Sequence, residues 1–174
     1  MLVGLAYPEL ERDDREAIVE FRRLHGTYFD VVNEHWTLIF PISGVSKEDL
    51  SRHIVQVVSR HAPIDFVIRY ALVHDDDFSD NYYIFLVPDE GFSAISRLHN
   101  DLASGVLQKF RRIDLPYVPH IAIATSKDVR HLKQLADNWN APKREISGRI
   151  TEITLSDYDG KKVTDLQTFK LGAS

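Results

Sequence analysis

Short β-type segments alternate with amphipathic helical segments along the whole chain, and no other feature of the sequence restricts the fold as strongly. The predicted strands are rich in β-branched and aromatic residues and are bounded by residues typical of turns. They cover residues 2–6, 35–41, 66–73, 82–87, 120–124, 145–155 and 161–170. Asp159 and Gly160 predict a hairpin turn before the last strand. Each half of the chain therefore has the order strand–helix–strand–helix–strand, with one extra strand at the end, which predicts a mixed α and β protein.

Four helices are predicted from apolar residues spaced three or four positions apart. The first is expected to begin at an Asp13 or Asp14 cap, to place Ile18, Phe21 and Leu24 on one face, and to end near Gly26. The second follows a Ser46 cap and presents Leu50, Ile54, Val57 and Val58; the third presents Ile95, Leu98 and Leu102; the fourth follows a Ser126 cap and presents Val129, Leu132, Leu135 and Ala136. Residues 106–119 are predicted to form a loop.

The length and composition are those of one globular domain, residues 1–174, with 44% apolar and 27% charged residues. There is no cysteine, which excludes disulfide bonds, thiolate catalysis and cysteine-bound zinc. No apolar run approaches the roughly 20 residues that span a bilayer, and the first residues do not resemble a secretion signal. We therefore expect a cytoplasmic protein that does not enter a membrane. Nothing in the sequence marks a subunit interface, and we expect a monomer.

The net charge of −5 argues against broad binding to duplex nucleic acid, which needs an extended basic surface. It is compatible with a small anionic substrate in one local basic cleft. An acidic run, residues 75–77, has two interpretations: a metal site, or a solvated turn between two strands. We favour the turn.

The predicted strand that begins at His35 places two polar side chains on one face. Side chains two positions apart on a strand point to the same side, so His35 and Thr37 face one way and Trp36 and Leu38 face the other. An imidazole beside a hydroxyl can donate two hydrogen bonds to a phosphoryl oxygen. By itself this pattern is weak, because a strand histidine is more often a packed side chain satisfied by a neighbour.

A second histidine occupies the equivalent place in the other half of the chain. His120 opens the middle strand of the second half, as His35 opens that of the first, and alternating apolar residues follow it. If the halves pack about a pseudo-twofold axis, the two imidazoles face each other across a cleft. In this second strand Ala122 replaces the hydroxyl with a methyl group.

These two segments resemble the paired His-x-Thr/Ser-x motifs of the 2H phosphoesterase superfamily, specifically the group related to bacterial 2′–5′ RNA ligase and RNA 2′,3′-cyclic phosphodiesterase. The first motif is His-Trp-Thr-Leu at 35–38, and the second is His-Ile-Ala-Ile at 120–123, preceded by Tyr-Val-Pro. The resemblance in element order covers nearly the whole chain. It implies an α+β fold of two lobes, with duplicated β-α-β-α-β units, mainly antiparallel sheets, a central cleft and one catalytic histidine strand from each half.

The resemblance also implies a reaction. It suggests hydrolysis of the 2′,3′-cyclic phosphate of an RNA end or a small nucleotide phosphoester, and the making or breaking of 2′–5′ RNA linkages. His35 and His120 would be the acid–base pair and Thr37 a phosphate donor, with no metal and no cofactor. One neutral and one protonated imidazole can coexist near neutrality, since an unperturbed histidine titrates near pH 6.5.

The chain departs from the family pattern at two positions. Ala122 occupies the place of the second Thr/Ser, and Thr125 stands where many relatives have a basic residue. Loss of one phosphate-orienting hydroxyl costs roughly 10- to 1000-fold in rate. A nucleotide- or RNA-binding module with little turnover is therefore the second hypothesis, and a purely structural protein is the third.

Two further residues are predicted to bind substrate. Tyr117 lies three residues before His120 and could stack on a base. Arg69 lies in the middle of an apolar strand and needs a partner, which is either a carboxylate of the protein or the substrate phosphate. His74 ends the same strand, beside the acidic run, and we do not expect it to touch substrate.

Overall fold

The computed structural model describes residues 1–76 and 79–172. Its elements, in chain order, are β1 (Leu2–Ala6), β2 (Glu9–Leu10), α1 (Arg12–His25), β3 (Trp36–Ile42), α2 (Lys47–Val58), β4 (Ile64–Asp75), β5 (Tyr82–Glu90), α3 (Phe92–Leu102), the 3₁₀ helix η1 (Gly105–Phe110), β6 (Ile121–Ser126), α4 (Val129–Asn140), β7 (Ile146–Ile150), β8 (Glu152–Tyr158) and β9 (Val163–Lys170). The predicted alternation of strands and helices is confirmed. β2 and η1 were not predicted, and η1 occupies the start of the stretch expected to be a loop.

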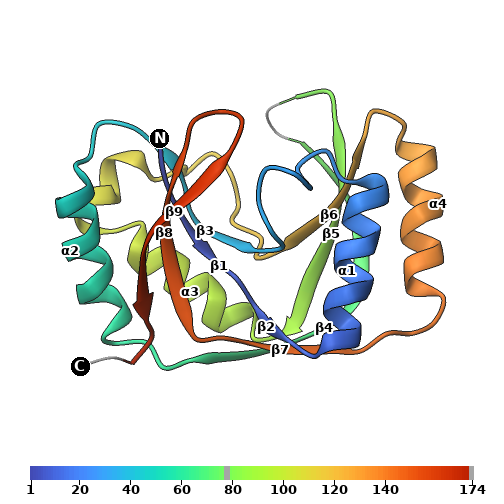
Figure 1. Ribbon diagram of the computed structural model, residues 1–174, viewed down its shortest axis with the longest axis horizontal. Coiled ribbons are helices and arrows are strands. Elements are labelled where there is room, and N and C mark those ends of the chain that lie inside the picture. Colours follow the sequence, from blue (N-terminus) through green and yellow to red (C-terminus); the bar gives the residue numbers. More distant parts are fainter. Residues whose placement is uncertain (77–78, 173–174) are drawn as a thin grey trace.

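Two antiparallel sheets form the centre of the molecule, with helices on their outer sides (Figure 1). One sheet has the strand order β3-β1-β8-β9, and the other has the order β2-β7-β4-β5-β6. Helices α2 and α3 lie beside the first sheet, and α1 and α4 cover the second (Figure 1). This is an α+β fold, as the sequence predicts. The helices leave the inner faces of both sheets uncovered, so that side chains on these faces can form a site.

Neither sheet is made from one half of the chain. β1 lies between β3 and β8, so that Leu2 is opposite Ile42 on one side and Asp157 on the other. The segment 146–158 contributes β7 to one sheet and β8 to the other, with only Thr151 between them. The first and last parts of the chain therefore share a sheet.

The single strand predicted over residues 145–155 is wrong. The structure has two strands because the alternation of buried side chains changes parity at Thr151. Ile146 and Ile150 are buried in β7, whereas Ile153 and Leu155 are buried in β8. A shift of one residue turns the apolar side chains to the other face, which is what the change of sheet requires.

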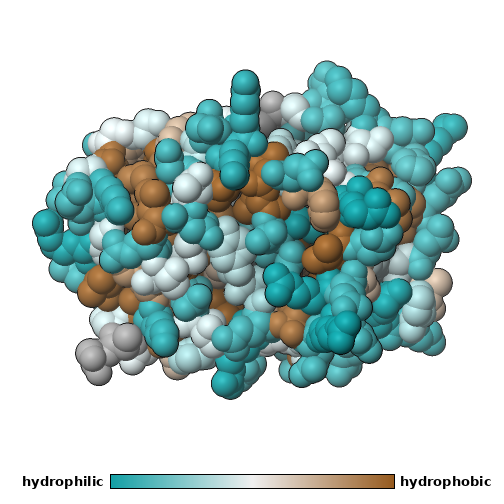
Figure 2. All heavy atoms as spheres, in the orientation of Figure 1, coloured by the Kyte–Doolittle hydropathy of each residue, from teal (hydrophilic) through white to brown (hydrophobic). Residues whose placement is uncertain are grey.

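One continuous apolar core joins the two sheets and the helices. Trp36 of β3 meets Phe66 of β4 edge to face, with ring centroids 5.0 Å apart, and both are almost fully buried. Gly148, on the neighbouring strand β7, lies directly beneath Phe66: a Cβ added there would approach the ring to 2.4 Å. On the face drawn in Figure 2, hydrophobic residues form separate patches among hydrophilic ones.

The predicted helix starts are confirmed in one case and wrong in two. Ser46 caps α2, because its Oγ accepts a hydrogen bond of 3.1 Å from the backbone N–H of Asp49. Helix α1 begins at Arg12, so Asp13 is already in the first turn and caps nothing. Helix α4 is capped by Asp128, whose carboxylate accepts from two backbone N–H groups. Ser126 is instead the last residue of β6.

The predicted apolar face of α1 is wrong at one position. Leu24 is 56% exposed, and the helix buries Ile18 together with Arg22, four residues later. Residues four positions apart lie on the same side of a helix. The buried side of α1 therefore includes the charged residue Arg22, which by its type would be expected on the surface. None of the described helices combines the length and apolar composition that crossing a bilayer would need.

Candidate active site

A cleft of about 380 Å³ lies between the inner faces of the two sheets. β3 and the residue before it contribute His35 and Thr37, and β6 and the residue before it contribute His120 and Ala122. Trp36, which alternates with them, is fully buried in the core. The face assignments made from strand periodicity are confirmed, and the two motif histidines line the same cleft.

Both histidines are anchored in the same way. The Nδ1–H of His35 donates to the carbonyl oxygen of Asn33 at 2.7 Å, and the Nδ1–H of His120 donates to that of Val118 at 2.7 Å. A backbone carbonyl can only accept, so Nδ1 has the proton in each neutral ring. Each ring is therefore left with Nε2 as the nitrogen that can exchange a proton with a ligand.

The protein environment makes both imidazoles harder to protonate. Burial lowers the pKa of His35 to about 4, and burial also lowers the pKa of His120 to about 4. The charge of a protonated His35 lowers the pKa of His120 further, so the two rings interact electrostatically. In the free protein both are therefore neutral at pH 7. A bound anion would raise these pKa values, because it stabilises the protonated form.

The ring of His120 is held by an aromatic stack that the sequence did not reveal. Phe85 lies against it with centroids 3.6 Å apart and planes at 14°, and His74 stacks on Phe85 at 4.9 Å. Phe85 is also the residue opposite Ala122 across the β5–β6 pair. Tyr83 lies two residues before Phe85 and lines the same cleft. The signal was present, since alternating residues of a predicted strand share one face.

A buried ion pair supports the segment that ends at His35. The Arg22 guanidinium donates to the carbonyl oxygen of Val32 at 2.7 Å and lies 3.8 Å from the carboxylate of Glu34. Both side chains are nearly inaccessible, at 5% and 4% exposure. Arg15 adds a second, partly exposed cation at 2.7 Å from Glu34. Arg22 lines the cleft, but its charge is already engaged by these partners.

Tyr117 lines the cleft and holds the β3 backbone. Its hydroxyl donates to the carbonyl oxygen of Thr37 at 2.9 Å, and its ring stacks on His99 with centroids 3.6 Å apart and planes at 4°. The Nδ1–H of His99 donates to the next carbonyl oxygen, that of Leu38, at 2.9 Å. Burial raises the pKa of the Tyr117 hydroxyl, so it remains a donor. The structure thus gives Tyr117 a role in positioning Thr37.

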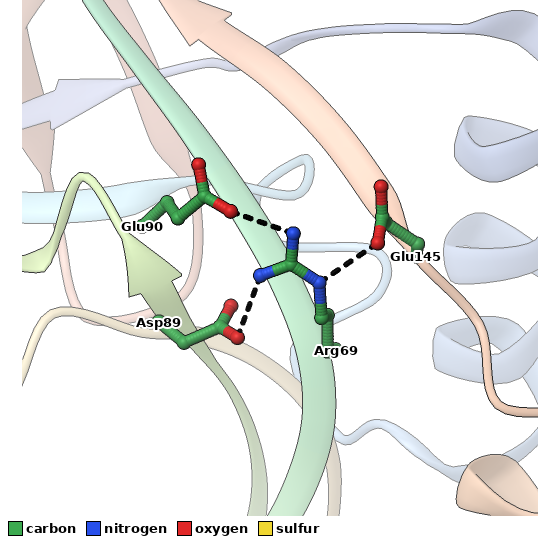
Figure 3. A network of polar contacts seen from close by, with 4 residues as sticks. All are labelled: Arg69, Asp89, Glu90 and Glu145. Carbon is green, nitrogen blue, oxygen red and sulfur yellow. Dashed lines mark hydrogen bonds and ion pairs between the residues drawn. The ribbon is translucent and has the colours of Figure 1, made fainter.

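The structure does not bring Arg69 into the cleft. Its guanidinium bonds three carboxylates, those of Asp89, Glu90 and Glu145, at 2.8, 2.6 and 2.8 Å (Figure 3). Arg69 is absent from the residues that line the cleft, and its side chain is 39% exposed. Of the two partners that the sequence allowed, the structure supplies carboxylates.

Substitution of Arg69 by Gln is expected to leave phosphate affinity in the cleft unchanged and to lower thermal stability only slightly, because exposed ion pairs contribute little. Thermal denaturation and phosphate titration of the variant measure both quantities. A strong loss of phosphate affinity in a folded Arg69→Gln variant would contradict this placement.

The acidic run lies at the rim of the cleft. Asp75 ends β4 and Asp76 follows it, and both line the cleft, whereas Asp77 is outside the described residues. Within residues 1–76 and 79–172, no three His, Asp or Glu side chains gather in a way that could hold a metal ion. Thr125 also lines the cleft.

Comparison with known proteins identifies the fold and the family. The chain matches solved structures over nearly its full length: E. coli LigT in apo form (20% identity, 99% of both chains, TM-score 0.56), a structure described as a phosphoesterase (19% identity, 99% of this chain and 98% of that one, TM-score 0.59) and Kluyveromyces marxianus Usb1 (12% identity, 98% of both, TM-score 0.55). A search of curated protein sequences gives no significant match. At these identities the structural matches establish the fold alone. The model of the 2′–5′ RNA ligase superfamily matches residues 9–162, and the chain therefore belongs to this superfamily of LigT-like 2H phosphoesterases.

Proposed function

We propose that this phosphoesterase hydrolyses the 2′,3′-cyclic phosphate of an RNA end or a nucleotide, with His35 and His120 as its acid–base pair and without a catalytic metal. One observation supports this most directly: the two motif histidines line one cleft from opposite sheets, each with Nδ1 anchored and Nε2 available. Opening a cyclic phosphate by water needs a base on the attacking side and an acid at the leaving oxygen. Two imidazoles on either side of a phosphate supply both.

The proposed reaction balances in one displacement. The neutral Nε2 of one histidine takes a proton from water as the new oxygen–phosphorus bond forms. The protonated Nε2 of the other gives its proton to the ribose oxygen as the old oxygen–phosphorus bond breaks. Thr37 donates a hydrogen bond to a non-bridging oxygen as charge develops there. With the 5′-hydroxyl of a second strand as the nucleophile in place of water, the same ring opening breaks the bond between phosphorus and O3′ and makes a 2′–5′ linkage.

The structural relatives are consistent with a nucleotide or phosphate ligand. E. coli LigT has been crystallised with NADP⁺, 3′-AMP, ATP and phosphate. These ligands share phosphate groups, and the cleft described here has the two imidazoles and the Thr37 hydroxyl to receive one.

Turnover of an oligonucleotide that ends in a 2′,3′-cyclic phosphate, measured with a strong chelator present, tests the proposal. We expect conversion to a phosphomonoester end at an unchanged rate with and without chelator. Absence of turnover by folded wild-type protein would refute the hydrolase proposal, and a rate that needs added metal would refute the metal-free mechanism.

Replacement of Thr37 by Val should lower kcat by roughly 10- to 1000-fold, since the isosteric change removes one transition-state donor and leaves the shape of the strand intact. Thr125→Val is the matched control, because it makes the same change elsewhere in the same cleft and should have little effect. Initial rates at saturating substrate measure the difference. Equal rates for the two variants would remove Thr37 from the mechanism.

One observation favours the second hypothesis, a binding module with little turnover. Ala122 faces the cleft, where its methyl group offers no hydrogen bond to phosphate. A binding module would show saturable affinity for a non-cyclic nucleotide but no turnover, whereas a purely structural protein would show neither. Ala122→Ser restores a hydroxyl at this position. An increase in kcat in this variant would support the enzyme and explain a slow wild-type rate.

A further inference from the structure

A second pocket, of about 300 Å³, adjoins the cleft and shares a wall with it. Four residues line both spaces: Phe40 of β3 and the segment Leu115, Pro116 and Tyr117. The second pocket continues on the far side of this segment, between β3, α3 and η1. A ligand in the cleft that extends past residues 115–117 would enter it.

The two spaces differ in charge. Among the described residues that line the cleft, Arg22 is the one Lys or Arg, and its guanidinium is committed to Val32 and Glu34. Asp75 and Asp76 add negative charge at the rim. The cleft can thus accept the single phosphate that reacts, but its described lining residues include no free Lys or Arg side chain for a second one.

The second pocket has more arginine side chains than the cleft, where the one arginine is already paired. Arg111 and Arg112 both line it. Arg112 is bound in two places by Asp114, at 2.9 and 2.6 Å. The side chain of Arg111 makes no hydrogen bond or ion pair within the described part of the chain. The pKa of His99 is lowered mainly by the burial of His99 and, to a smaller extent, by the nearby charge of Arg111. Arg111 is therefore close to the pocket wall and available to a ligand.

The walls of the second pocket suit a nucleobase. Phe40, Phe110 and the stacked Tyr117–His99 pair line it, and aromatic faces bind bases without regard to sequence. Ile113 lies at the same pocket with 90% of its surface exposed. A base that covered this side chain would remove apolar surface from water, which is favourable.

We propose that the second pocket binds the nucleotide that precedes the cyclic phosphate, with Arg111 contacting the connecting phosphate. This rests on the proposed function, and it assigns as substrate an RNA end of at least two nucleotides in preference to a cyclic mononucleotide. Tyr117 would then contact both nucleotides across the shared wall, while its hydroxyl holds Thr37.

Two substrates separate this inference from the function it rests on: a nucleoside 2′,3′-cyclic phosphate and a dinucleotide with the same cyclic end. Each is tested with wild type, with Arg111→Gln and with Arg130→Gln, an exposed arginine of α4 that lines neither space. For the dinucleotide we expect Arg111→Gln to raise KM by roughly 10-fold or more, since a charged hydrogen bond to phosphate is lost. For the mononucleotide KM should not change, and Arg130→Gln should affect neither substrate.

The dependence of kcat/KM on salt gives a second readout. Its slope for the dinucleotide should be steeper in wild type than in Arg111→Gln, because one phosphate contact is lost. Equal effects of Arg111→Gln on both substrates, or no effect on either, would refute the proposed nucleotide site in the second pocket. Neither result would contradict the proposed hydrolase function. No turnover of either substrate by wild type would refute the proposed function itself.

Discussion

Alanine at His35 or at His120 is expected to lower kcat for a cyclic phosphate by about 10²- to 10⁴-fold, because each substitution removes the base or the acid of the same displacement. The double variant should be little slower than either single variant, since residues that act as a unit do not contribute additively. His131→Ala on the exposed side of α4 is the control and should retain full activity. Retention of full activity by a folded His120→Ala variant would contradict the mechanism.

The pH dependence of these rates follows from the lowered pKa of each imidazole. In the free protein both rings lose their protons above about pH 4, so the base form persists at neutral pH while the acid form becomes scarce. We therefore expect kcat/KM, which reports the free enzyme, to be highest on the acidic side of neutrality and to fall as pH rises. The optimum of kcat should lie at higher pH, because the bound phosphate raises the pKa of the acid. A kcat/KM optimum above pH 7 would contradict this.

The free energy of unfolding should also depend on pH through His35 and His120. Because the folded-state pKa of each histidine lies below the ordinary histidine value of 6.5, the unfolded chain binds more protons between about pH 6.5 and 4. This contribution to the free energy of unfolding is complete above pH 6.5 and is lost as pH falls through that window. Denaturant titrations across it measure the loss, which should be smaller in a variant that lacks both histidines.

Replacement of Glu34 by Gln is expected to destabilise the fold by about 3 kcal/mol, because it leaves the Arg22 guanidinium buried without its counter-charge. For a chain of this size that corresponds to a fall in Tm of roughly 6–12 °C. The estimate takes the lower end of the usual range for broken buried pairs, since the two groups approach only to 3.8 Å. Cleavage should also suffer, because Glu34 immediately precedes His35.

Two further variants test whether the loss of the Arg22–Glu34 ion pair causes the loss of stability in Glu34→Gln. Glu16→Gln breaks an exposed pair with Arg12 and should change stability by less than about 1 kcal/mol. Arg22→Met combined with Glu34→Gln removes both charges and should recover most of the loss. If the double variant were less stable than Glu34→Gln alone, the unpaired charge could not be the source of the effect.

The sequence predicted those parts of the site that depend on strand periodicity alone. His35 and Thr37 share a face because they are two residues apart, and so do His120 and Ala122. The fold class and the order of elements follow from the same local patterns. Assigning the two histidines to one cleft needed the similar order of elements in the two halves of the chain. Both histidines do line one cleft, although neither sheet is built from one half alone.

The features that the sequence missed depend on contacts between distant residues. The carboxylates that bind Arg69 lie 20, 21 and 76 residues away from it, and no local pattern pairs them. The stack of Phe85 on His120 likewise joins two strands whose register is set by the whole sheet. The division between β7 and β8 was more accessible, since the change of parity at Thr151 is visible in the sequence.

The position of β1 has a consequence for how the chain folds. β1 is an inner strand, and its second neighbour, β8, is made of residues roughly 150 positions later in the chain. During synthesis from the N-terminus, β1 can pair only with β3 until residues 152–158 have left the ribosome. Contacts of such long sequence separation slow folding. The antiparallel β1–β3 pair therefore keeps one unpaired edge until almost the whole protein has been translated.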